Sequence, residues 1–392
     1  MAGNETDATE NESEGRRRMA TTTFFEGSVT RTWRGKVASQ CSKLLLDQYN
    51  DLIQKKKVER SETLTFERLL GSGGQGVVYR SHRHGADGFT LPIAVKIFAP
   101  ECYDDDRAYN DSMSHIANIS SLVSRIQHDH LLDVHNWIDA GNVRMMIMEC
   151  VDGFDLSRLL CHDMLAHIKN KVSEKRWNSI NDVVVTAGPA HPRLKPGIAI
   201  AIIRDCLSAL AALHREGIVH CDIKPANVML KRTGSVKIVD IGSALEIEKD
   251  HHSRACTPIY AAPEVLEGGE ITPRSDLASL GYMLIEMLSG VPPFDGRASR
   301  KDLLEAKRLM AQKLPQFLPP EVVSSELLMN FCRGLIAPDP NRRFPSAEAA
   351  ELLKEGAAGF HRQLVKGDLA SEYENDIRIW LGELEDYDPK QC

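Results

Sequence analysis

The stretch His220-Cys221-Asp222-Ile223-Lys224-Pro225-Ala226-Asn227 places a carboxylate, an ammonium and an amide within one short segment. Just downstream, the largely apolar run 236–239 leads to a second carboxylate, Asp240, which is followed by Ile241 and Gly242. A base for a hydroxyl, a lysine for a phosphate and two oxygen-bearing side chains for a metal ion are the groups that phosphoryl transfer needs. Because that reaction depends on placed charges more than on covalent chemistry, the spacing itself indicates it.

The composition is that of an ordinary globular protein. Of the 392 residues, 42% are hydrophobic and 26% are charged, which is typical of soluble domains. The length allows about two or three units of roughly 150 residues. The net charge of −7 gives no indication of a nucleic-acid partner. No apolar run approaches the roughly 18 residues of a membrane helix, so we expect no membrane span.

The cysteines and the N-terminus bear on location in the cell. The nine cysteines are scattered, their number is odd and no Cys-x-x-Cys pair occurs, which is typical of reduced thiols. The chain starts with acidic side chains, unlike the basic start of a secretory signal. The sequence therefore predicts a cytoplasmic protein.

Changes in composition and periodicity divide the chain. Apolar positions between Lys36 and Lys57 recur at helical spacing, whereas the runs at 64–66, 77–79 and 93–98 have strand character. Past Val151 the chain becomes mainly helical, with apolar helices predicted over 198–214 and 277–288. We expect a disordered arm at 1–35, an N-terminal helix at 36–60, a β-rich lobe at 61–150, an α-rich lobe at 151–361 with a polar, irregular insert at about 166–197, and an acidic tail at 362–392 with an amphipathic stretch around 373–384.

The segment Gly71-Ser72-Gly73-Gly74-Gln75-Gly76 lies between two predicted strands. Glycines let backbone N–H groups approach phosphate oxygens, although a plain hairpin turn fits the same letters. A strand after the glycines argues against a dinucleotide-binding fold, in which a helix follows at once. Lys96 is the one charge in the run 93–98, and a buried lysine is costly without an anion. An edge-strand lysine in water is the alternative, but beside the glycine loop a phosphate partner explains Lys96 better.

The ordered series of motifs resembles that of eukaryotic-like serine/threonine protein kinases over residues of about 64–360. The series comprises the glycine loop, the Ala94-Val95-Lys96 strand, the 220–227 loop, Asp240-Ile241-Gly242, the segment Thr257 to Glu264, Asp276 to Gly281, and Arg343. The resemblance implies an α+β, bilobal fold with a small β-rich N-lobe and a larger α-rich C-lobe. It also implies ATP, Mg²⁺ and a protein substrate that offers a serine or threonine.

The resemblance assigns roles residue by residue. Asp222 matches the catalytic base, Lys224 matches the lysine that steadies the transferring phosphate, and Thr257 matches the threonine that bonds both. Asn227 and Asp240 match the metal-holding side chains. The residues that match the family's nucleotide contacts, in the glycine loop, the lysine strand, the adenine sandwich and the hinge, are Gly71, Gly73, Gly76, Val78, Ala94, Lys96, Met148, Glu149, Val151 and Met229.

Other matches are architectural. Glu264 and Arg343 resemble the buried ion pair that holds the end of the activation segment. Asp276 resembles the carboxylate that accepts hydrogen bonds from the backbone of the catalytic loop, and such groups hold the reacting side chains in place.

The chain departs from the family at three positions. Ile119 stands where the family has the helix glutamate that pairs with the strand lysine, and no glutamate occurs between Glu101 and Glu149. Either one of the aspartates 104, 105, 106 and 111 reaches Lys96, or Lys96 relies on Asp240 and the nucleotide. Cys221 replaces the arginine that grips a phosphate on the activation loop, so a switch by loop phosphorylation is not expected. Ile241 replaces a phenylalanine and keeps an apolar side chain there.

Three functions remain open at the level of sequence. The first is an active protein serine/threonine kinase, and the second is a pseudokinase that acts as a nucleotide-binding scaffold. A scaffold has no need of the full set Lys96, Asp222, Asn227 and Asp240, which favours the enzyme. A small-molecule phosphotransferase is the third, but the segment 257–264 resembles a platform for a peptide substrate. The N-terminal helix and the acidic tail are the candidate contacts for a regulatory partner.

Overall fold

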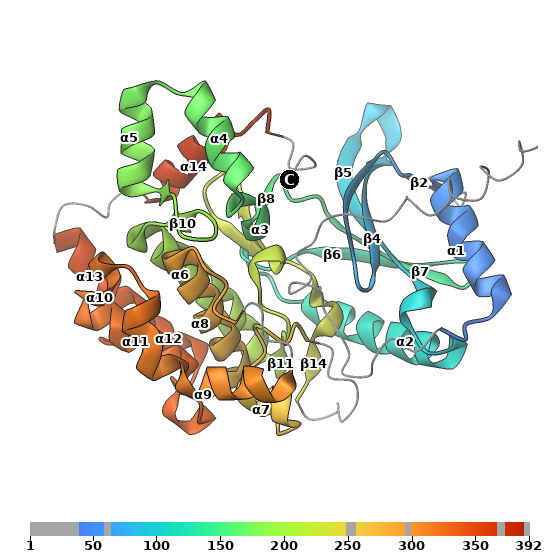
Figure 1. Ribbon diagram of the computed structural model, residues 1–392. Helices are drawn as coiled ribbons and strands as arrows, with labels where there is room; N and C mark the ends of the chain where they lie inside the picture. Colours follow the sequence, from blue (N-terminus) through green and yellow to red (C-terminus); the bar gives the residue numbers. More distant parts are fainter. Residues whose placement is uncertain (1–38, 59–63, 248–255, 295–298, 367–372, 388–392) are drawn as a thin grey trace, which may run out of the picture.

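The computed structural model describes residues 39–58, 64–247, 256–294, 299–366 and 373–387, and the predicted arm at 1–35 lies outside them. Two lobes of unequal size lie side by side (Figure 1). The smaller lobe is built on an antiparallel sheet and the larger lobe is mainly helical, so the predicted α+β bilobal architecture is confirmed.

A five-stranded antiparallel sheet forms the small lobe, with the strand order β3-β4-β5-β7-β6. The central strand β5 is buried on both faces over its second half, because the sheet and the helices around it cover the β-branched run that includes Ile93, Val95 and Ile97. The strands are β3 Arg68–Gly73, β4 Gly76–His84, β5 Thr90–Phe98, β6 Val134–Ala140 and β7 Val143–Glu149.

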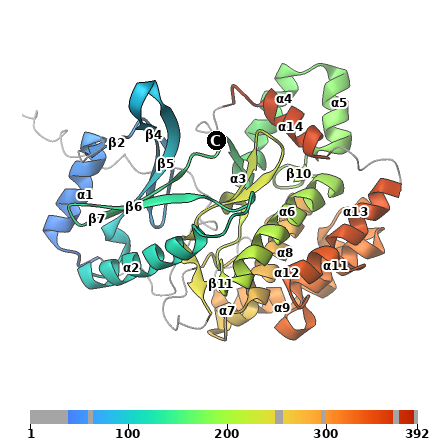
Figure 2. The same ribbon diagram turned by 180° about the vertical axis from the view of Figure 1, so that it is seen from behind.

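Two helices flank this sheet. Ser42 caps α1 (Lys43–Lys55), which buries Leu45, Tyr49 and Leu52 against the small lobe. Asp105 caps α2, and Figure 2 shows α2 running beside the sheet toward the large lobe. The elements that complete this region are the short paired strands β1 Lys57–Val58 and β2 Leu64–Thr65 and the helix α2 Asp106–Val123.

The large lobe is organised around two long apolar helices, α6 and α8, which pack on each other. A three-stranded sheet of order β13-β12-β8 and the pair β11-β14 lie toward the small lobe. The strands are β8 Gly153–Asp155, β11 Ile218–Val219, β12 Val228–Lys231, β13 Val236–Ile238 and β14 Leu245–Glu246. The helices are α3 Leu156–Leu159, α6 Pro196–Arg215, α7 Pro263–Glu267, α8 Pro273–Ser289, α9 Arg300–Phe317, α10 Pro320–Val323, α11 Glu326–Ile336, α12 Ala347–Leu352 and α13 Ala357–Lys366.

Helix α6 is long and apolar enough to cross a membrane if only its length and composition are considered, and no other helix in the described ranges passes that test. Its apolar window is 72% buried inside the protein, where α8, α12, α13 and α14 surround it. Its place at the centre of the large lobe accounts for its composition.

The prediction of an irregular insert at 166–197 is wrong. This part of the chain forms two helices, each with a buried and an exposed side, and a short antiparallel pair of strands. Its sparse apolar side chains, among them Ile168, Ile180 and Leu194, are fully buried, whereas most of its polar side chains are at least partly exposed. The elements are α4 His162–Lys171, α5 Glu174–Val183, β9 Val185–Thr186 and β10 Arg193–Leu194.

The amphipathic stretch predicted around 373–384 is confirmed as α14 (Tyr373–Glu383). Figure 1 shows α14 beside α4 and α5. Ion pairs tie α14 and the turn after it to these helices. Arg176 Nε of α5 lies 2.7 Å from Glu383 Oε1 of α14, and Lys171 Nζ of α4 lies 2.9 Å from Oδ2 of Asp386, just past the end of α14. Trp380 is fully buried within the core of the large lobe.

We predict that Trp380→Ala lowers the free energy of unfolding by about 3–5 kcal/mol, because it empties a fully buried site. Urea denaturation followed by circular dichroism measures this loss. The control is Ile379→Ala on the same helix, whose side chain is 38% exposed and whose truncation removes little packing. Equal losses in the two variants would show that α14 is not packed as described.

Candidate active site

The loop that follows β11 is held by a carboxylate from α8. Asp276, fully buried, accepts hydrogen bonds from the backbone N–H of His220 at 2.8 Å and of Cys221 at 2.9 Å. The Nε2 atom of His214 on α6 lies 2.9 Å from the same carboxylate. Cys221 has a φ of 67°, a conformation that non-glycine residues adopt only when their surroundings impose it. The loop geometry is thus fixed by a core helix.

Three other predicted site residues, from two segments, meet around Asp222. Its Oδ1 accepts hydrogen bonds from the Thr257 backbone N–H at 3.0 Å and from Thr257 Oγ1 at 2.7 Å. Its Oδ2 accepts one from Asn227 Nδ2 at 3.0 Å and lies 2.9 Å from Lys224 Nζ. Lys224 Nζ donates to Thr257 Oγ1 at 2.8 Å. The result is a buried carboxylate whose orientation is set by donors on both of its oxygens.

Lys96 on β5 reaches across to the turn that follows β13. Its Nζ lies 2.6 Å from Asp240 Oδ1, and Gly242 N–H donates to the same oxygen at 3.1 Å. Burial would raise the pKa of Asp240, but the Lys96 ammonium, with help from Lys224 and the Gly242 N–H, lowers it to about 2. Asp240 is therefore ionised at neutral pH and available to a cation.

The remaining predicted nucleotide contacts line up along the sheet and the link between the lobes. Val78 pairs with Lys96, Ala94 pairs with Met148, and Met229 lies in β12 opposite Lys237. Val151 follows β7 and packs on the core of the small lobe. In the glycine loop, Gly71 and Gly73 face open space, whereas a Cβ at Gly76 would overlap the carbonyl of Ile97. Gly76 is thus required by the close approach of β5.

The side chain of Glu149 is not directed at a nucleotide. It forms an ion pair with Lys237 of β13 and accepts a hydrogen bond from the Asp133 N–H at 2.7 Å. Only the backbone of Glu149 is left for the role that the sequence predicts at this position. Lys237 was not singled out from the sequence, because a lysine within a short strand does not indicate which distant residue it will contact.

Comparison with known proteins agrees with this geometry. The protein kinase domain family matches residues 64–355. This chain belongs to the protein kinase family. Serine/threonine-protein kinase PknH of Mycobacterium bovis is 30% identical over 289 residues, which are 72% of this chain and 41% of that protein. PknD of Mycobacterium tuberculosis is 30% identical over 290 residues, which are 71% and 37% of the two chains. PrkC of Bacillus subtilis is 25% identical over 288 residues, which are 72% and 39%. The matched region of this kinase thus spans about two fifths of these relatives.

The kinase has no carboxylate on α2 opposite Lys96. Ile119 is 1% exposed and packs within the apolar core of the large lobe. In the described part of the chain, the polar partners of Lys96 are Asp240 and Gln75, whose Oε1 accepts from Nζ at 2.8 Å. The aspartates near the start of α2 therefore do not pair with Lys96. Gln75 was missed from the sequence. Lys96 lacked an expected partner, and Gln75 is the one long polar side chain of the neighbouring glycine loop, which could have pointed to it.

The predicted ion pair between Glu264 and Arg343 is present. Arg343 donates from both terminal nitrogens to the two carboxylate oxygens of Glu264, each at 2.7 Å, and Ser275 Oγ donates to Glu264 Oε1 at 2.9 Å. Arg343 also donates to the carbonyls of Ala337 and Arg274. This network fastens α7, which ends the segment of Thr257, to the large lobe.

Two further buried groups fix the turn at 257–261. Lys307 Nζ on α9 donates to the Ile259 carbonyl at 2.7 Å and lies 4.0 Å from the centroid of the Tyr282 ring. Burial lowers the pKa of Lys307 well below its ordinary value. Tyr260 donates from its hydroxyl to Glu286 Oε2 at 2.5 Å. The residues beside Thr257 are therefore anchored to both α8 and α9. The residues just before this turn, 248–255, lie outside the described residues, and they include the hydroxyl-bearing Ser253.

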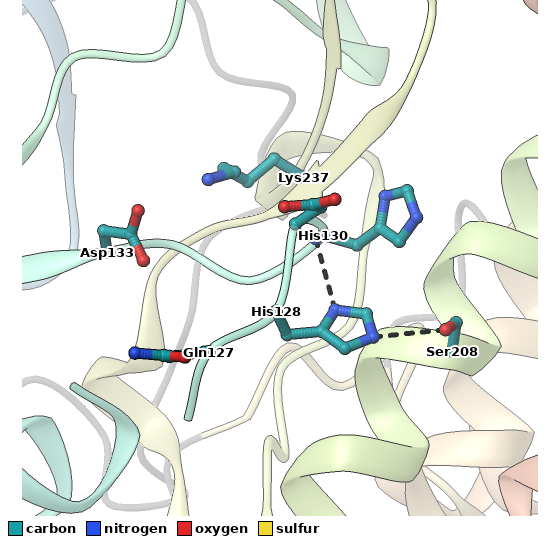
Figure 3. Close-up of a pocket in the computed structure, with 7 residues that line it drawn as sticks. Gln127, His128, His130, Asp133, Ser208 and Lys237 are labelled. Atoms are coloured by element: carbon teal, nitrogen blue, oxygen red, sulfur yellow. Dashed lines mark hydrogen bonds between the residues drawn. The ribbon is translucent and has the colours of Figure 1, made fainter. Parts of the chain in front are cut away.

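A polar pocket of about 490 Å³ lies elsewhere, behind the link between the lobes. Figure 3 shows His128 and Ser208 joined by a hydrogen bond of 3.1 Å on one wall. Lys237 forms another wall, and none of the residues predicted for the active site lines the pocket. It does not add to the catalytic geometry.

We predict that Arg343→Met lowers the free energy of unfolding by about 3–5 kcal/mol, because it leaves the Glu264 carboxylate buried without its partner. Urea denaturation measures the loss. Glu321→Gln breaks the pair of Glu321 with Arg193, which lies 2.6 Å away, but Glu321 is 42% exposed, and less than about 1 kcal/mol is expected. A similar small loss for Arg343→Met would contradict a structural role for its pair.

We predict that Lys96→Met raises the pKa of Asp240 from about 2 toward its ordinary value of 3.8 or above, because burial then acts without the neighbouring ammonium. A carboxyl NMR titration measures it. In the unchanged protein, the stability that this pair contributes is complete above pH 3.8 and is lost as the pH falls through about 2. An unchanged pKa in the variant would show that Lys96 is not the partner.

Proposed function

We propose that this chain is a protein serine/threonine kinase that transfers the γ-phosphate of ATP to a protein hydroxyl. The observation that carries the proposal is the buried cluster of Asp222, Lys224, Asn227 and Thr257 in the large lobe, together with the ion pair between Asp240 of the same lobe and Lys96 of the small lobe. The relatives that match the chain are named as serine/threonine-protein kinases. A scaffold without catalysis needs neither the oriented carboxylate nor the paired lysine.

In this proposal Asp222 accepts the proton of the substrate hydroxyl. Its carboxylate is oriented by donors from Thr257 and Asn227, so little reorganisation is required when the hydroxyl arrives. Lys224 lies against the same carboxylate and supplies positive charge where the transferring phosphate gains negative charge. Thr257 links the two, so the turn at 257–261 both presents the substrate and completes the site.

The side chains of Asn227 and Asp240 suit Mg²⁺. Asn227 uses its Nδ2 to donate to Asp222, which leaves its Oδ1 as an acceptor for a cation. Asp240 is ionised. The described residues contain no cluster of three or more His, Cys, Asp or Glu that could hold a metal, and Mg²⁺ is commonly held by one or two protein oxygens plus substrate phosphates. When bound, Mg²⁺ neutralises charge on the phosphates.

The nucleotide contacts follow the cleft. Lys96 pairs with the α- and β-phosphates beneath the glycine loop, where Gly71 and Gly73 leave space for close approach of backbone. Val78, Ala94 and Met229 enclose the adenine, and the backbone of Glu149 and Val151 reads its edge after the gatekeeper Met148. We divide the lobes at residues 150 and 151, within the link that carries these contacts.

Location and partners complete the proposal. No disulfide joins the cysteines in the part of the chain that the structure describes, which fits a reducing cytoplasm. The apolar face of α14 is buried on the large lobe, so a regulatory partner would contact its polar face or α1.

We predict that Asp222→Asn lowers kcat for phosphate transfer by roughly 10²- to 10⁴-fold, because the general base is lost. Transfer from γ-labelled ATP to a basic or acidic protein substrate with Mg²⁺ measures it, and nucleotide binding is expected to persist. The control is Asp163→Asn in the exposed first turn of α4, which leaves the rate unchanged. Nucleotide binding without transfer by the unchanged protein would favour the scaffold.

A further inference from the structure

The ammonium of Lys96 is buried beside a single carboxylate of the described residues. Lys96 is 5% exposed, and its ion pair within the described residues is the one with Asp240. The acidic side chains at the start of α2 are occupied elsewhere. Asp105 caps the helix, Asp106 accepts from the Ser42 N–H at 2.6 Å, and Asp111 pairs with Arg107. Something other than α2 must orient the lysine.

Gln75 supplies the second acceptor from the glycine loop. Its Oε1 lies 2.8 Å from Lys96 Nζ, while Asp240 Oδ1 lies 2.6 Å from the same nitrogen. The backbone holds the loop at this depth, because the Gln75 carbonyl accepts a hydrogen bond from the Ala99 N–H at 3.0 Å. Across from the loop, the amide fits only because residue 242 is a glycine. A Cβ at Gly242 would overlap the Gln75 amide oxygen. The glutamine therefore spans from the loop to the Asp240 turn.

A neutral acceptor has a different consequence from a carboxylate. An amide oxygen fixes the direction of one N–H of the ammonium but does not neutralise its charge. Lys96 thus keeps more positive potential for a polyphosphate than it would beside a second carboxylate. The acceptor is also carried by the loop that covers the phosphates and not by α2. The orientation of Lys96 then depends on the position of the glycine loop.

We propose that Gln75 is the positioning residue that orients Lys96 in place of a helix carboxylate, so that the glycine loop and not α2 sets this lysine for nucleotide phosphates. This inference rests on the proposed function. Helix α2 is anchored independently, since Ile119 packs in the core of the large lobe and His115 Nε2 contacts the Ala244 carbonyl at 3.0 Å.

The test compares Gln75→Met, which keeps the length of the side chain without the acceptor, with Gln75→Glu, which keeps an acceptor. Gln54→Met on the exposed face of α1 is the matched control. For each protein, kcat and KM for ATP, the Kd of a fluorescent ADP analogue and the melting temperature are measured. We expect Gln75→Met to lower kcat/KM for ATP and nucleotide affinity by about tenfold, the loss of one hydrogen bond to a charged group.

In Gln75→Glu we expect both values to lie between those of Gln75→Met and the unchanged protein, because the acceptor is kept but the carboxylate offsets part of the Lys96 charge. The melting temperature is expected to be the same in all variants. Unchanged or tighter nucleotide binding in Gln75→Met would overturn the inference, since the amide would then be a group that the nucleotide displaces without loss. Nucleotide affinity in Gln75→Glu that is no higher than in Gln75→Met, or equal to that of the unchanged protein, would overturn it as well. If the unchanged protein transfers no phosphate, the proposed function fails, but the binding measurements still decide the role of Gln75.

Discussion

The buried carboxylate of Asp276 is the interaction on which the rest of the site depends. A charged group with no solvent contact is costly unless donors replace its water, and here two backbone N–H groups of the 220–227 loop and the His214 ring do so. Because Asp276 lies on α8 in the core of the large lobe, its hydrogen bonds hold the loop in a fixed position against that core. Cys221 can then keep its positive φ, and Asp222 is placed beside Thr257.

The two halves of the site are joined by charge. Lys96 belongs to the sheet of the small lobe and Asp240 to the turn after β13, yet they form a short ion pair. Burial works against the ionised form of Asp240, and the nearby ammonium more than compensates for it. The same ammonium faces the glycine loop through Gln75. The glycine loop, β5 and the turn at Asp240 are thus connected at the Nζ atom of Lys96.

Two features of the site differ from the family pattern that the sequence resembles. By the resemblance, Cys221 stands where the family has an arginine that reads a phosphate, and among the described residues α2 offers no carboxylate to Lys96. In this chain α2 is fixed by apolar packing and by His115, and the turn at 257–261 is fixed by Lys307 and Tyr260. The arrangement favours a site that is assembled by packing and buried polar contacts.

Short-range patterns in the sequence determined much of this protein. The groups at 220–227 are close together in any fold, and strand and helix periodicity identified both lobes because apolar faces must be buried. The insert was misjudged because its sparse apolar residues become a core only beside α6 and α14, and Arg176 and Glu383 are 207 residues apart. Lys96 meets Asp240 across 144 residues and Gln75 across 21. Which acceptor reaches a buried ammonium depends on how loop, sheet and turn pack together, and that was decided only by the tertiary structure.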